Sequence, residues 1–330
     1  MEFRFLGRTG VRVSALCLGT MPFGAEADEA ASAAIVHAAR ESGVNFFDSA
    51  DVYAGGRAEE ILGRLVKDVR EEVIITSKAY FQAGTDVNAM GASRRHLFLS
   101  VEKSLRRLQT DRIDVYFVHR FDDRTPLEET LRALDDLVRQ GKILYTGASN
   151  FAAWQVEKAL GVAAKAGWTP FHVLQPMYSL VKRQAEAEIL PMAQAENLGV
   201  ITYSPLAGGL LSGKYGVGRK PETGRLLTHK ISQVRYGEPW NYEVAERFAD
   251  FARGRGLDPV TLAVAWVGSH PAVTAPIIGP RAADQLRASL AAADLKMTAE
   301  LRAAVSALSP EPPPATDRNE ERTETNFGVR

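Results

Sequence analysis

The sequence predicts a (β/α)8 barrel, because eight short apolar segments alternate with helical patterns along most of the 330-residue chain. A doubly wound open sheet is the structural alternative. Such a sheet usually carries a glycine-rich nucleotide-binding turn after its first strand. The turn here is Leu18-Gly19-Thr20-Met21-Pro22, which lacks that pattern, so the barrel is favoured.

The elements follow in order along the chain. Residues 3–14 alternate apolar and polar around Gly7 and Gly10, which predicts a hairpin ahead of the barrel. Buried parallel strands are expected at 15–18, 44–47, 73–76, 113–118, 143–146, 172–174, 200–203 and 275–278. Helices are expected at 28–42, 57–67, 94–108, 126–140, 152–166, 184–197, 243–255, 259–268 and 282–293.

The helix at 126–140 has the clearest boundaries. Thr125 is the predicted N-cap, Pro126 the first helical residue, Glu128 the partner in a capping box, and Gly141 the stop signal. Residues 208–241 form a long glycine-rich, basic connection of the kind used as a functional lid or left disordered. We expect one barrel domain over residues 1–308, followed by an extended or disordered tail over 309–330.

Bulk composition excludes several classes of protein. Forty basic residues balance forty acidic ones, which gives no electrostatic reason to expect binding to nucleic acid or to a membrane surface. The single cysteine, Cys17, cannot form an intramolecular disulfide and suits a reducing compartment. There is no apolar signal segment and no run of the ~20 apolar residues that a membrane span requires. We expect a soluble, cytoplasmic protein.

Ionisable residues stand at the ends of three consecutive predicted strands. The second strand delivers Asp48, with Tyr53 in the following loop, the third delivers Lys78 and the fourth His119. In barrel enzymes these carboxyl ends carry the chemistry. Singly, each residue has an ordinary structural explanation, but together the four predict a catalytic patch. Asp51 is closer in sequence to the tyrosine, but it has no strand-end position and is left out of this set.

The patch suits proton transfer by a phenol. An ordinary tyrosine has a pKa of about 10. A neighbouring Lys78 cation would lower the pKa of Tyr53, Asp48 would hold the ammonium, and His119 would bind a substrate carbonyl. No adequate set of metal ligands is visible. A Schiff-base aldolase using Lys78 is an alternative, but that lysine would need a lowered pKa, which an adjacent carboxylate opposes.

The later strands offer groups for a hydride-donating cofactor. Ser149, Asn150 and Gln175 have amide and hydroxyl groups suited to the carboxamide of a nicotinamide, and Tyr203 offers a flat face. The eighth strand leads through Gly279 and Arg281 into a helix, an arrangement that favours phosphate. Residues 208–215 match a P-loop as far as the lysine, but a tyrosine replaces the magnesium-binding Ser or Thr. We therefore reject a nucleoside-triphosphatase and expect this loop to lie against a pyrophosphate.

With these residues in place, the chain from Phe3 to about Leu308 resembles the aldo-keto reductases, and in particular the bacterial branch that also resembles potassium-channel β-subunits. The matching motifs are Asp48-Ser-Ala-Asp-Val-Tyr53, Ile74-Ile-Thr-Ser-Lys78, Tyr116-Phe-Val-His119-Arg120, Gly147-Ala-Ser-Asn150, Tyr203-Ser-Pro-Leu-Ala-Gly-Gly-Leu-Leu-Ser-Gly-Lys-Tyr215 and Pro276-Ile-Ile-Gly-Pro-Arg-Ala-Ala-Asp-Gln285. The resemblance implies NADPH-dependent reduction of aldehydes or ketones, or the reverse oxidation.

The resemblance also implies residue roles. Tyr53 would be the general acid, tuned by Asp48 and Lys78, and His119 would orient the carbonyl. Cofactor contacts would come from Gly19, Thr20 and Met21 beside the nicotinamide, Ser149, Asn150, Gln175 and Tyr203 around its ring, Ser204, Leu206, Gly208 and Lys214 along the pyrophosphate, and Gly279, Arg281, Gln285 and Ser289 at the adenosine. Arg281 would bind a 2′-phosphate, which favours NADPH over NADH.

All four catalytic positions match the family pattern, and two other positions depart from it. Ala58 replaces a common serine, and Ser289 stands where asparagine is frequent, so the adenine contacts remain open. An alternative function is a cofactor-binding regulatory module of the channel β-subunit kind with weak reductase activity. The sequence leaves the substrate, the preferred reaction direction and the oligomeric state undetermined.

Overall fold

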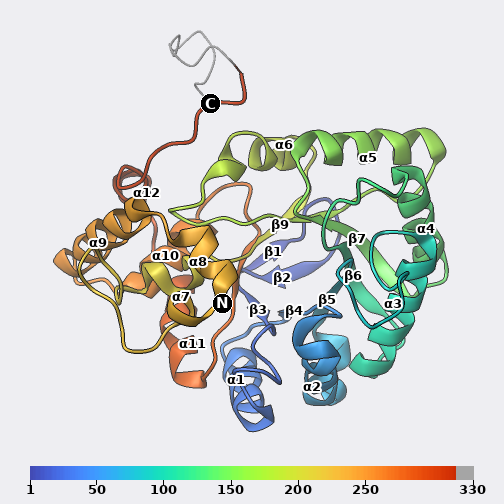
Figure 1. Ribbon diagram of the computed structural model, residues 1–330, viewed down its shortest axis with the longest axis horizontal. Helices are drawn as coiled ribbons and strands as arrows, with labels where there is room; N and C mark the ends of the chain where they lie inside the picture. The colour runs from blue at the N-terminus through green and yellow to red at the C-terminus, as the bar shows by residue number, and fades with distance from the viewer. Residues whose placement is uncertain (317–330) are drawn as a thin grey trace.

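The computed structural model describes residues 1–316 and contains the predicted barrel. Parallel strands close on themselves in the order β10-β3-β4-β5-β6-β7-β8-β9, with helices packed around them (Figure 1). The strands are β3 (Cys17–Gly19), β4 (Phe46–Asp48), β5 (Ile74–Ala79), β6 (Ile113–Val118), β7 (Ile143–Ser149), β8 (Val173–Gln175), β9 (Gly199–Thr202) and β10 (Ala275–Ile278). The part of the predicted tail from residue 317 onward lies outside the described residues.

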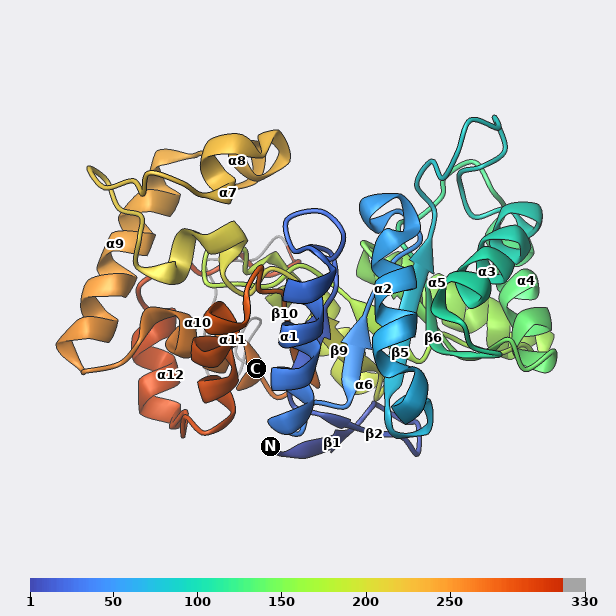
Figure 2. The ribbon, with the colours of Figure 1, turned by 90° about the horizontal axis from the view of Figure 1, so that it is seen from below.

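The predicted N-terminal hairpin is also present. Strands β1 (Phe3–Phe5) and β2 (Arg12–Ser14) pair antiparallel in a sheet of their own. Figure 2 shows this hairpin at one end of the barrel and the helices α7 and α8 at the other. Leu6 and Val13 from this segment are fully buried against strand residues of the barrel interior, such as Phe46 and Val115. The hairpin therefore closes the amino-terminal end of the barrel.

The helices match most of the expected positions. They are α1 (Glu29–Glu41), α2 (Arg57–Val66), α3 (Arg94–Leu108), α4 (Leu127–Arg139), α5 (Ala153–Ala166), α6 (Ile189–Ala195), α7 (Arg225–Thr228), α8 (Lys230–Tyr236), α9 (Pro239–Gly254), α10 (Pro259–Gly268), α11 (Ala283–Leu290) and α12 (Ala299–Ser306). Three of these were not predicted. The connection after β9 contains the short helices α7 and α8, and α12 begins at the Thr298 N-cap near the end of the described chain.

Three predicted helix boundaries are wrong. Pro126 rather than Thr125 is the N-cap of α4, because the Thr125 hydroxyl donates instead to Asp122 at 2.7 Å. The segment 184–197 is divided, because Pro191 lacks an N–H group and fits only the first turn of α6. Helix α9 begins at Pro239 rather than 243, since proline is well suited to the first position of a helix.

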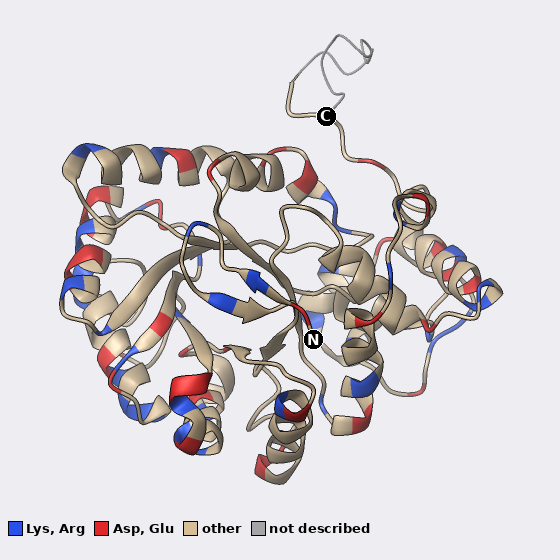
Figure 3. Cartoon of the chain, turned by 180° about the vertical axis from the view of Figure 1, so that it is seen from behind, with Lys and Arg blue, Asp and Glu red and all other residues tan. Residues whose placement is uncertain are grey.

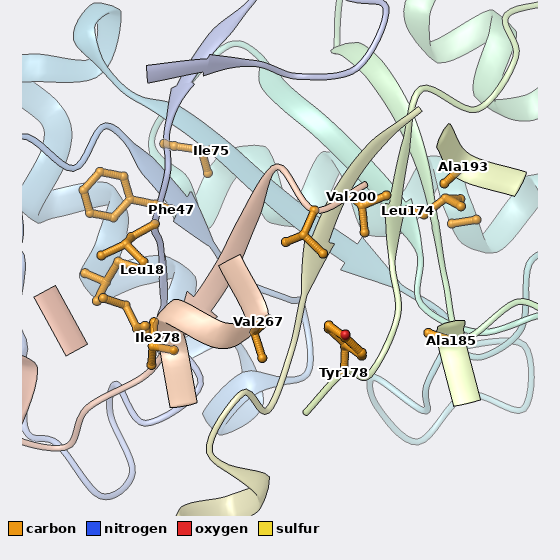
Figure 4. Close-up of a cluster of buried hydrophobic side chains, with 14 of the residues drawn as sticks. Leu18, Phe47, Ile75, Leu174, Tyr178, Ala185, Ala193, Val200, Val267 and Ile278 are labelled. Carbon is orange, nitrogen blue, oxygen red and sulfur yellow. The ribbon is translucent and has the colours of Figure 1, made fainter. Parts of the chain in front are cut away.

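Side chains alternate between the two faces of each strand and so form two buried layers. Leu18, Phe47 and Ile75 point outward and pack in the core between strands and helices (Figure 4). Their neighbours Cys17 and Phe46 belong to the second cluster, which fills the barrel interior. Because side chains alternate with a period of two, the next inward position on a strand is two residues further along. This parity decides which residues reach the carboxyl-end rim of the barrel.

Candidate active site

Three neighbouring strands bring the predicted catalytic residues together. Asp48 ends β4 and pairs in register with Thr76 of β5, two residues before Lys78. His119 follows directly after β6, and its amide donates to the Ala79 carbonyl of β5 at 3.0 Å. Parity points Asp48, Thr76 and Lys78 to the same inner side of the barrel. The arrangement at the rim therefore follows from strand register.

Lys78 and Asp48 form a buried ion pair. The Lys78 Nζ lies 2.8 Å from Asp48 Oδ2, and the lysine side chain has no exposed surface. The other carboxylate oxygen of Asp48 accepts from Thr76 Oγ1 at 2.6 Å and from Gln175 Nε2 at 2.8 Å. Both oxygens of the carboxylate are thus bound, as a buried charge requires. This fixes the position of the Lys78 ammonium.

Tyr53 begins a short 3₁₀ segment immediately beyond the loop that follows β4. Its hydroxyl lies 3.4 Å from Lys78 Nζ, and the same nitrogen lies 5.1 Å from the centre of the tyrosine ring. Two further bonds hold the intervening loop to the lysine residue. Lys78 Nζ donates to the Ser49 carbonyl at 2.6 Å, and the Asp51 amide donates to the Lys78 carbonyl at 3.1 Å. The phenol is therefore held beside the ammonium.

Burial and neighbouring charges together decide the protonation of Lys78 and Tyr53. Burial alone would lower the pKa of Lys78, but the adjacent Asp48 and Tyr53 outweigh it and raise the pKa above its usual value. Burial raises the pKa of Tyr53, and the opposing effect of Lys78 does not compensate. The expected net lowering of the phenol pKa is therefore wrong. Tyr53 stays a phenol that carries its proton, and Lys78 stays an ammonium, which is the wrong form for a Schiff-base nucleophile.

His119 lies at the same rim as a neutral imidazole. Burial, together with the nearby Lys78 charge, holds the pKa of His119 well below its usual value. Its ring meets Tyr53 edge-on, with centroids 6.2 Å apart, and meets Phe81 in the same way at 4.8 Å. The buried Nδ1 of His119 has no hydrogen-bond partner among the described residues. A neutral ring of this kind can donate a hydrogen bond from one of its nitrogens to a polar ligand.

The residues predicted to surround a nicotinamide form one hydrogen-bonded chain across β7, β8 and β9. Ser149 Oγ donates to the Gln175 carbonyl at 2.9 Å, and Asn150 Nδ2 donates to Ser149 Oγ at 3.0 Å. The Tyr203 hydroxyl donates to Asn150 Oδ1 at 2.7 Å. The Gln175 amide nitrogen reaches Asp48, so this chain joins the ion pair. The five residues lie on one continuous polar surface.

The loop after β9 has a backbone with several positive φ angles and accessible peptide groups. Ser204, Ala207, Gly208, Gly209 and Gly213 all have positive φ angles, and residues 207–212 form a kinked 3₁₀ segment rather than a P-loop. A side chain at Gly209 would meet nothing within 4 Å, so the peptide groups there are accessible to a neighbour. Consecutive amides in such conformations form concave anion-binding surfaces. The predicted residue Leu206 is the N-cap of this segment, and the predicted Lys214, which is exposed, follows its C-cap Gly213.

The predicted adenosine residues lie around β10 and α11. Gly279 faces Gly19 where β10 meets β3, since a side chain on Gly279 would lie 3.7 Å from the Gly19 carbonyl oxygen. Arg281 is exposed just before α11, and its backbone amide donates to Gln285 Oε1 at 3.2 Å. Arg281 is close enough to Tyr215 to affect its pKa. Ser289, by contrast, is buried on the inner side of α11.

Two further predicted residues begin the β3–α1 loop. The Thr20 side chain is fully buried, and its hydroxyl donates to the Asp48 carbonyl at 3.0 Å. Met21 is half-buried at the rim, where its sulfur accepts from Arg225 at 3.6 Å. Thr20 therefore supports the strand that carries the carboxylate, and Met21 meets the lid.

Aromatic residues flank the entrance to the site. Phe81 is 40% exposed beside His119, and Phe121 packs edge-on against Phe151 at 5.3 Å. Trp154 lies 6.1 Å from Phe121 and is largely exposed. Phe23 of the β3–α1 loop is fully buried in the core between strands and helices, so it does not line this entrance.

Two site residues were missed by the sequence interpretation. Thr76 was detectable, because it precedes Lys78 by two residues and must face the same side of β5. Arg225 of α7 reaches the site from the connection after β9, where it bonds Met21 and opposes the raised pKa of Tyr53. Its Nε is buried and bonds to no group within residues 1–316. No sequence signal marks Arg225, because an irregular connection determines its place.

Basic and acidic side chains are interspersed along the helices in the view of Figure 3. Among residues 1–316, no helix combines the length and apolarity needed to cross a bilayer.

Comparison with known proteins gives a consistent result. Residues 15–309 match the model of the aldo/keto reductase family. The chain is 38% identical over 328 residues to the uncharacterized oxidoreductase YrpG of Bacillus subtilis, covering 94% of this chain and 97% of that one. It is 37% identical to a probable voltage-gated potassium channel subunit beta of Oryza sativa (89% and 92% covered) and 31% identical to versiconal hemiacetal acetate reductase of Aspergillus parasiticus (91% and 94% covered). With the barrel and the rim cluster in place, the chain belongs to the aldo/keto reductase family.

Proposed function

We propose that this protein is an NADP(H)-dependent oxidoreductase that reduces aldehydes or ketones to alcohols, with Tyr53 as the general acid. The observation that carries the proposal is the buried arrangement of Asp48, Lys78 and Tyr53, with 2.8 Å and 3.4 Å between successive polar groups. It matches the oxidoreductase assignment that family membership supports. Tyr53 keeps its proton and Lys78 its charge, because both pKa values are raised, as a proton donor beside a stabilising cation requires.

Each of the four catalytic residues has a distinct task. His119, as a neutral imidazole, donates a hydrogen bond to the carbonyl oxygen and orients it. Tyr53 transfers its proton to that oxygen as negative charge develops there. The Lys78 ammonium stabilises the phenolate that remains, since a cation at this distance favours the charged form. Asp48 keeps Lys78 in place.

The residues present fit a nicotinamide dinucleotide. The open backbone after β9, with Lys214, Arg225 and Arg281 around it, has the donor groups that a pyrophosphate and a further phosphate need. When bound, the cofactor supplies the hydride. Ser149, Asn150 and Gln175 hold the carboxamide, and Tyr203 covers the ring. Gly19, Thr20 and Met21 line the other side of the nicotinamide.

The remaining proposed contacts are with the pyrophosphate and the adenosine of the cofactor. Ser204, Leu206, Gly208 and Lys214 would lie along the pyrophosphate, and Gly279, Arg281 and Gln285 would surround the adenosine. Ser289 is buried on α11 and is left out of this set. Arg281 is the exposed cation at the start of α11 and favours NADPH over NADH. We also propose one catalytic domain over residues 1–308. The protein's partner in this account is a small carbonyl compound.

A carbonyl substrate screen tests the proposal. Purified protein, NADPH and a panel of aliphatic and aromatic aldehydes and ketones are mixed, and the loss of NADPH absorbance is followed. Tyr53→Phe is expected to reduce the rate by about 10²- to 10⁴-fold, as loss of a general acid does. Tyr145→Phe on β7 is the matched control and retains the rate. A Tyr53→Phe variant as active as the wild type contradicts the assigned role.

A regulatory module is the second candidate, because relatives at 34–37% identity are named as probable potassium-channel β-subunits. Such a protein would bind the dinucleotide tightly and turn over slowly. The same screen separates the two functions. Multiple turnovers with a carbonyl substrate support the reductase, whereas tight NADPH binding without turnover supports the module.

A further inference from the structure

Asp51 is a buried carboxylate in the loop that holds Tyr53. Its side chain is only 4% exposed, and neither carboxylate oxygen has a side-chain hydrogen-bond partner among the described residues, although the backbone amide of Val52 lies close enough to lower its pKa. Its main chain is part of the catalytic framework, because the Asp51 amide donates to the Lys78 carbonyl at 3.1 Å. An ionised carboxylate left unpaired at such a site is costly, so its presence calls for a reason.

The groups around Asp51 form a cluster behind the catalytic strand. Glu59 of α2 is fully buried, accepts from Ser77 Oγ at 2.5 Å, and pairs with Arg107 of α3 at 2.7 Å. Ser77 lies between Thr76 and Lys78 and faces outward, so this cluster lies on the other side of β5 from the ammonium. Tyr116 of β6 is buried beside this cluster with its hydroxyl near Ser104, and burial raises its pKa, with Asp51 and Glu59 acting in the same direction.

Both cations near Asp51 already form ion pairs with other carboxylates. Lys78 pairs with Asp48 and Arg107 pairs with Glu59, whereas no ion pair forms to Asp51 within residues 1–316. The two pairs are neutral in sum. Ionised Asp51 therefore adds one uncompensated negative charge beside the catalytic pair, and protonated Asp51 adds none.

We propose that Asp51 is a positioning residue that tunes Tyr53 through this cluster: neutral Asp51 leaves Lys78 free to stabilise the phenolate, and ionised Asp51 opposes it. The proposal rests on the proposed role of Tyr53 as general acid. Charges in a buried, low-dielectric region interact over longer distances than in water, so no direct contact is needed.

The charge of Asp51 is expected to change within the physiological pH range. Burial raises the pKa of Asp51 to about 7, with the Glu59 carboxylate acting in the same direction and Arg107 and Lys78 opposing it. His119 is already neutral at that pH, and Tyr53 and Lys78 keep their protons. Asp51 therefore titrates near neutrality, where His119, Tyr53 and Lys78 do not change their charge. Reduction should slow as pH rises through 7, because the phenolate formed by proton donation becomes less stable.

The pH profile of kcat/KM for carbonyl reduction tests the proposal. The wild type is expected to fall by about three- to tenfold across an inflection near pH 7. Asp51→Asn holds the side chain neutral and should remove that inflection. Asp135→Asn is the matched control, because Asp135 is equally buried but belongs to a separate cluster with Arg139 and Thr169. Its profile should keep the inflection. An inflection that persists in Asp51→Asn, or is missing in the wild type, overturns the proposal and leaves the reductase function intact.

A second readout does not depend on activity. Protein with ¹³Cζ-labelled tyrosine gives a Tyr53 resonance that is assigned by its loss in Tyr53→Phe. This resonance should shift with an inflection near pH 7 in the wild type and not in Asp51→Asn. If no carbonyl is reduced, the proposed function fails, and this titration still decides whether Asp51 couples to Tyr53. A resonance that is flat near neutral pH in the wild type overturns the coupling.

Discussion

Gln175 Nε2 donates a 2.8 Å hydrogen bond to Asp48 Oδ1 across the barrel. The two residues are 127 positions apart, and their strands, β8 and β4, are separated by three strands in either direction around the ring. A residue predicted to hold a cofactor therefore also fixes the carboxylate that holds Lys78. The surface proposed for the cofactor and the proposed catalytic pair are one hydrogen-bonded unit.

Replacing Gln175 tests this unit. Gln175→Leu removes one donor to a buried carboxylate, and a hydrogen bond to a charged group contributes about 1.5–3 kcal/mol. We expect a loss of that size in the free energy of unfolding, measured by urea denaturation. A loss close to zero would mean that Thr76 and Lys78 alone satisfy Asp48.

Thr76 has a matched control within the same barrel. Thr76 and Thr202 are both fully buried on strands, but Thr76 donates to Asp48 at 2.6 Å, whereas the Thr202 hydroxyl bonds to nothing in the described part of the chain. Thr76→Val is expected to cost about 1.5–3 kcal/mol of stability, whereas Thr202→Val should be neutral or stabilising. Calorimetric melting compares the two isosteric changes. Equal costs would contradict a specific role for the Thr76 bond.

Lys78→Met leaves Asp48 buried without its cation. Breaking a buried ion pair costs about 3–5 kcal/mol, so we expect a loss of that order at pH 7. The unpaired carboxylate would have a raised pKa in the folded variant, so its stability should improve as pH falls toward 5. Denaturation at the two pH values measures this. Asp48→Asn in the Lys78→Met background should recover part of the loss, and failure to do so points to packing instead.

Arg281→Ala tests cofactor preference. Loss of the cation proposed for the 2′-phosphate should raise KM for NADPH by about tenfold or more and leave KM for NADH unchanged. Arg287→Ala is the control, because Arg287 is also exposed but lies in the last turn of α11. Equal KM values for the two cofactors in the wild type, or an unchanged preference in Arg281→Ala, would count against the assignment.

The raised pKa of Asp51 predicts how stability depends on pH. The folded pKa of about 7 lies above an unfolded value near 3.9, so the native state holds an extra proton between these values. The free energy of unfolding should therefore decrease by up to about 4 kcal/mol as pH rises from 4 to 7. Asp51→Asn should flatten this slope relative to the wild type. Parallel curves from urea denaturation would show that Asp51 is ionised throughout.

Much of the fold was readable from the sequence. The predicted bounds of β6, β10, α3 and α10 agree with the structure, because buried apolar runs and amphipathic periods mark them strongly. The wrong helix predictions lie where local sequence signals conflict or are weak. Asp122 competes for the Thr125 hydroxyl, and the lid helices α7 and α8 are too short to show a period.

The sequence by itself determined the barrel, the strand-end positions of Asp48, Lys78 and His119, and the proximity of Tyr53, because strand parity and chain order are local properties. Only the tertiary structure decided the energetics of the site. Burial raises the pKa of Tyr53 where the residue pattern predicted a lowered one, and barrel closure brings Gln175 onto Asp48. It also places Asp51, which the sequence interpretation left out, in a buried cluster with Glu59 and Arg107. These outcomes depend on solvent exclusion and on contacts between distant strands, which no local pattern encodes.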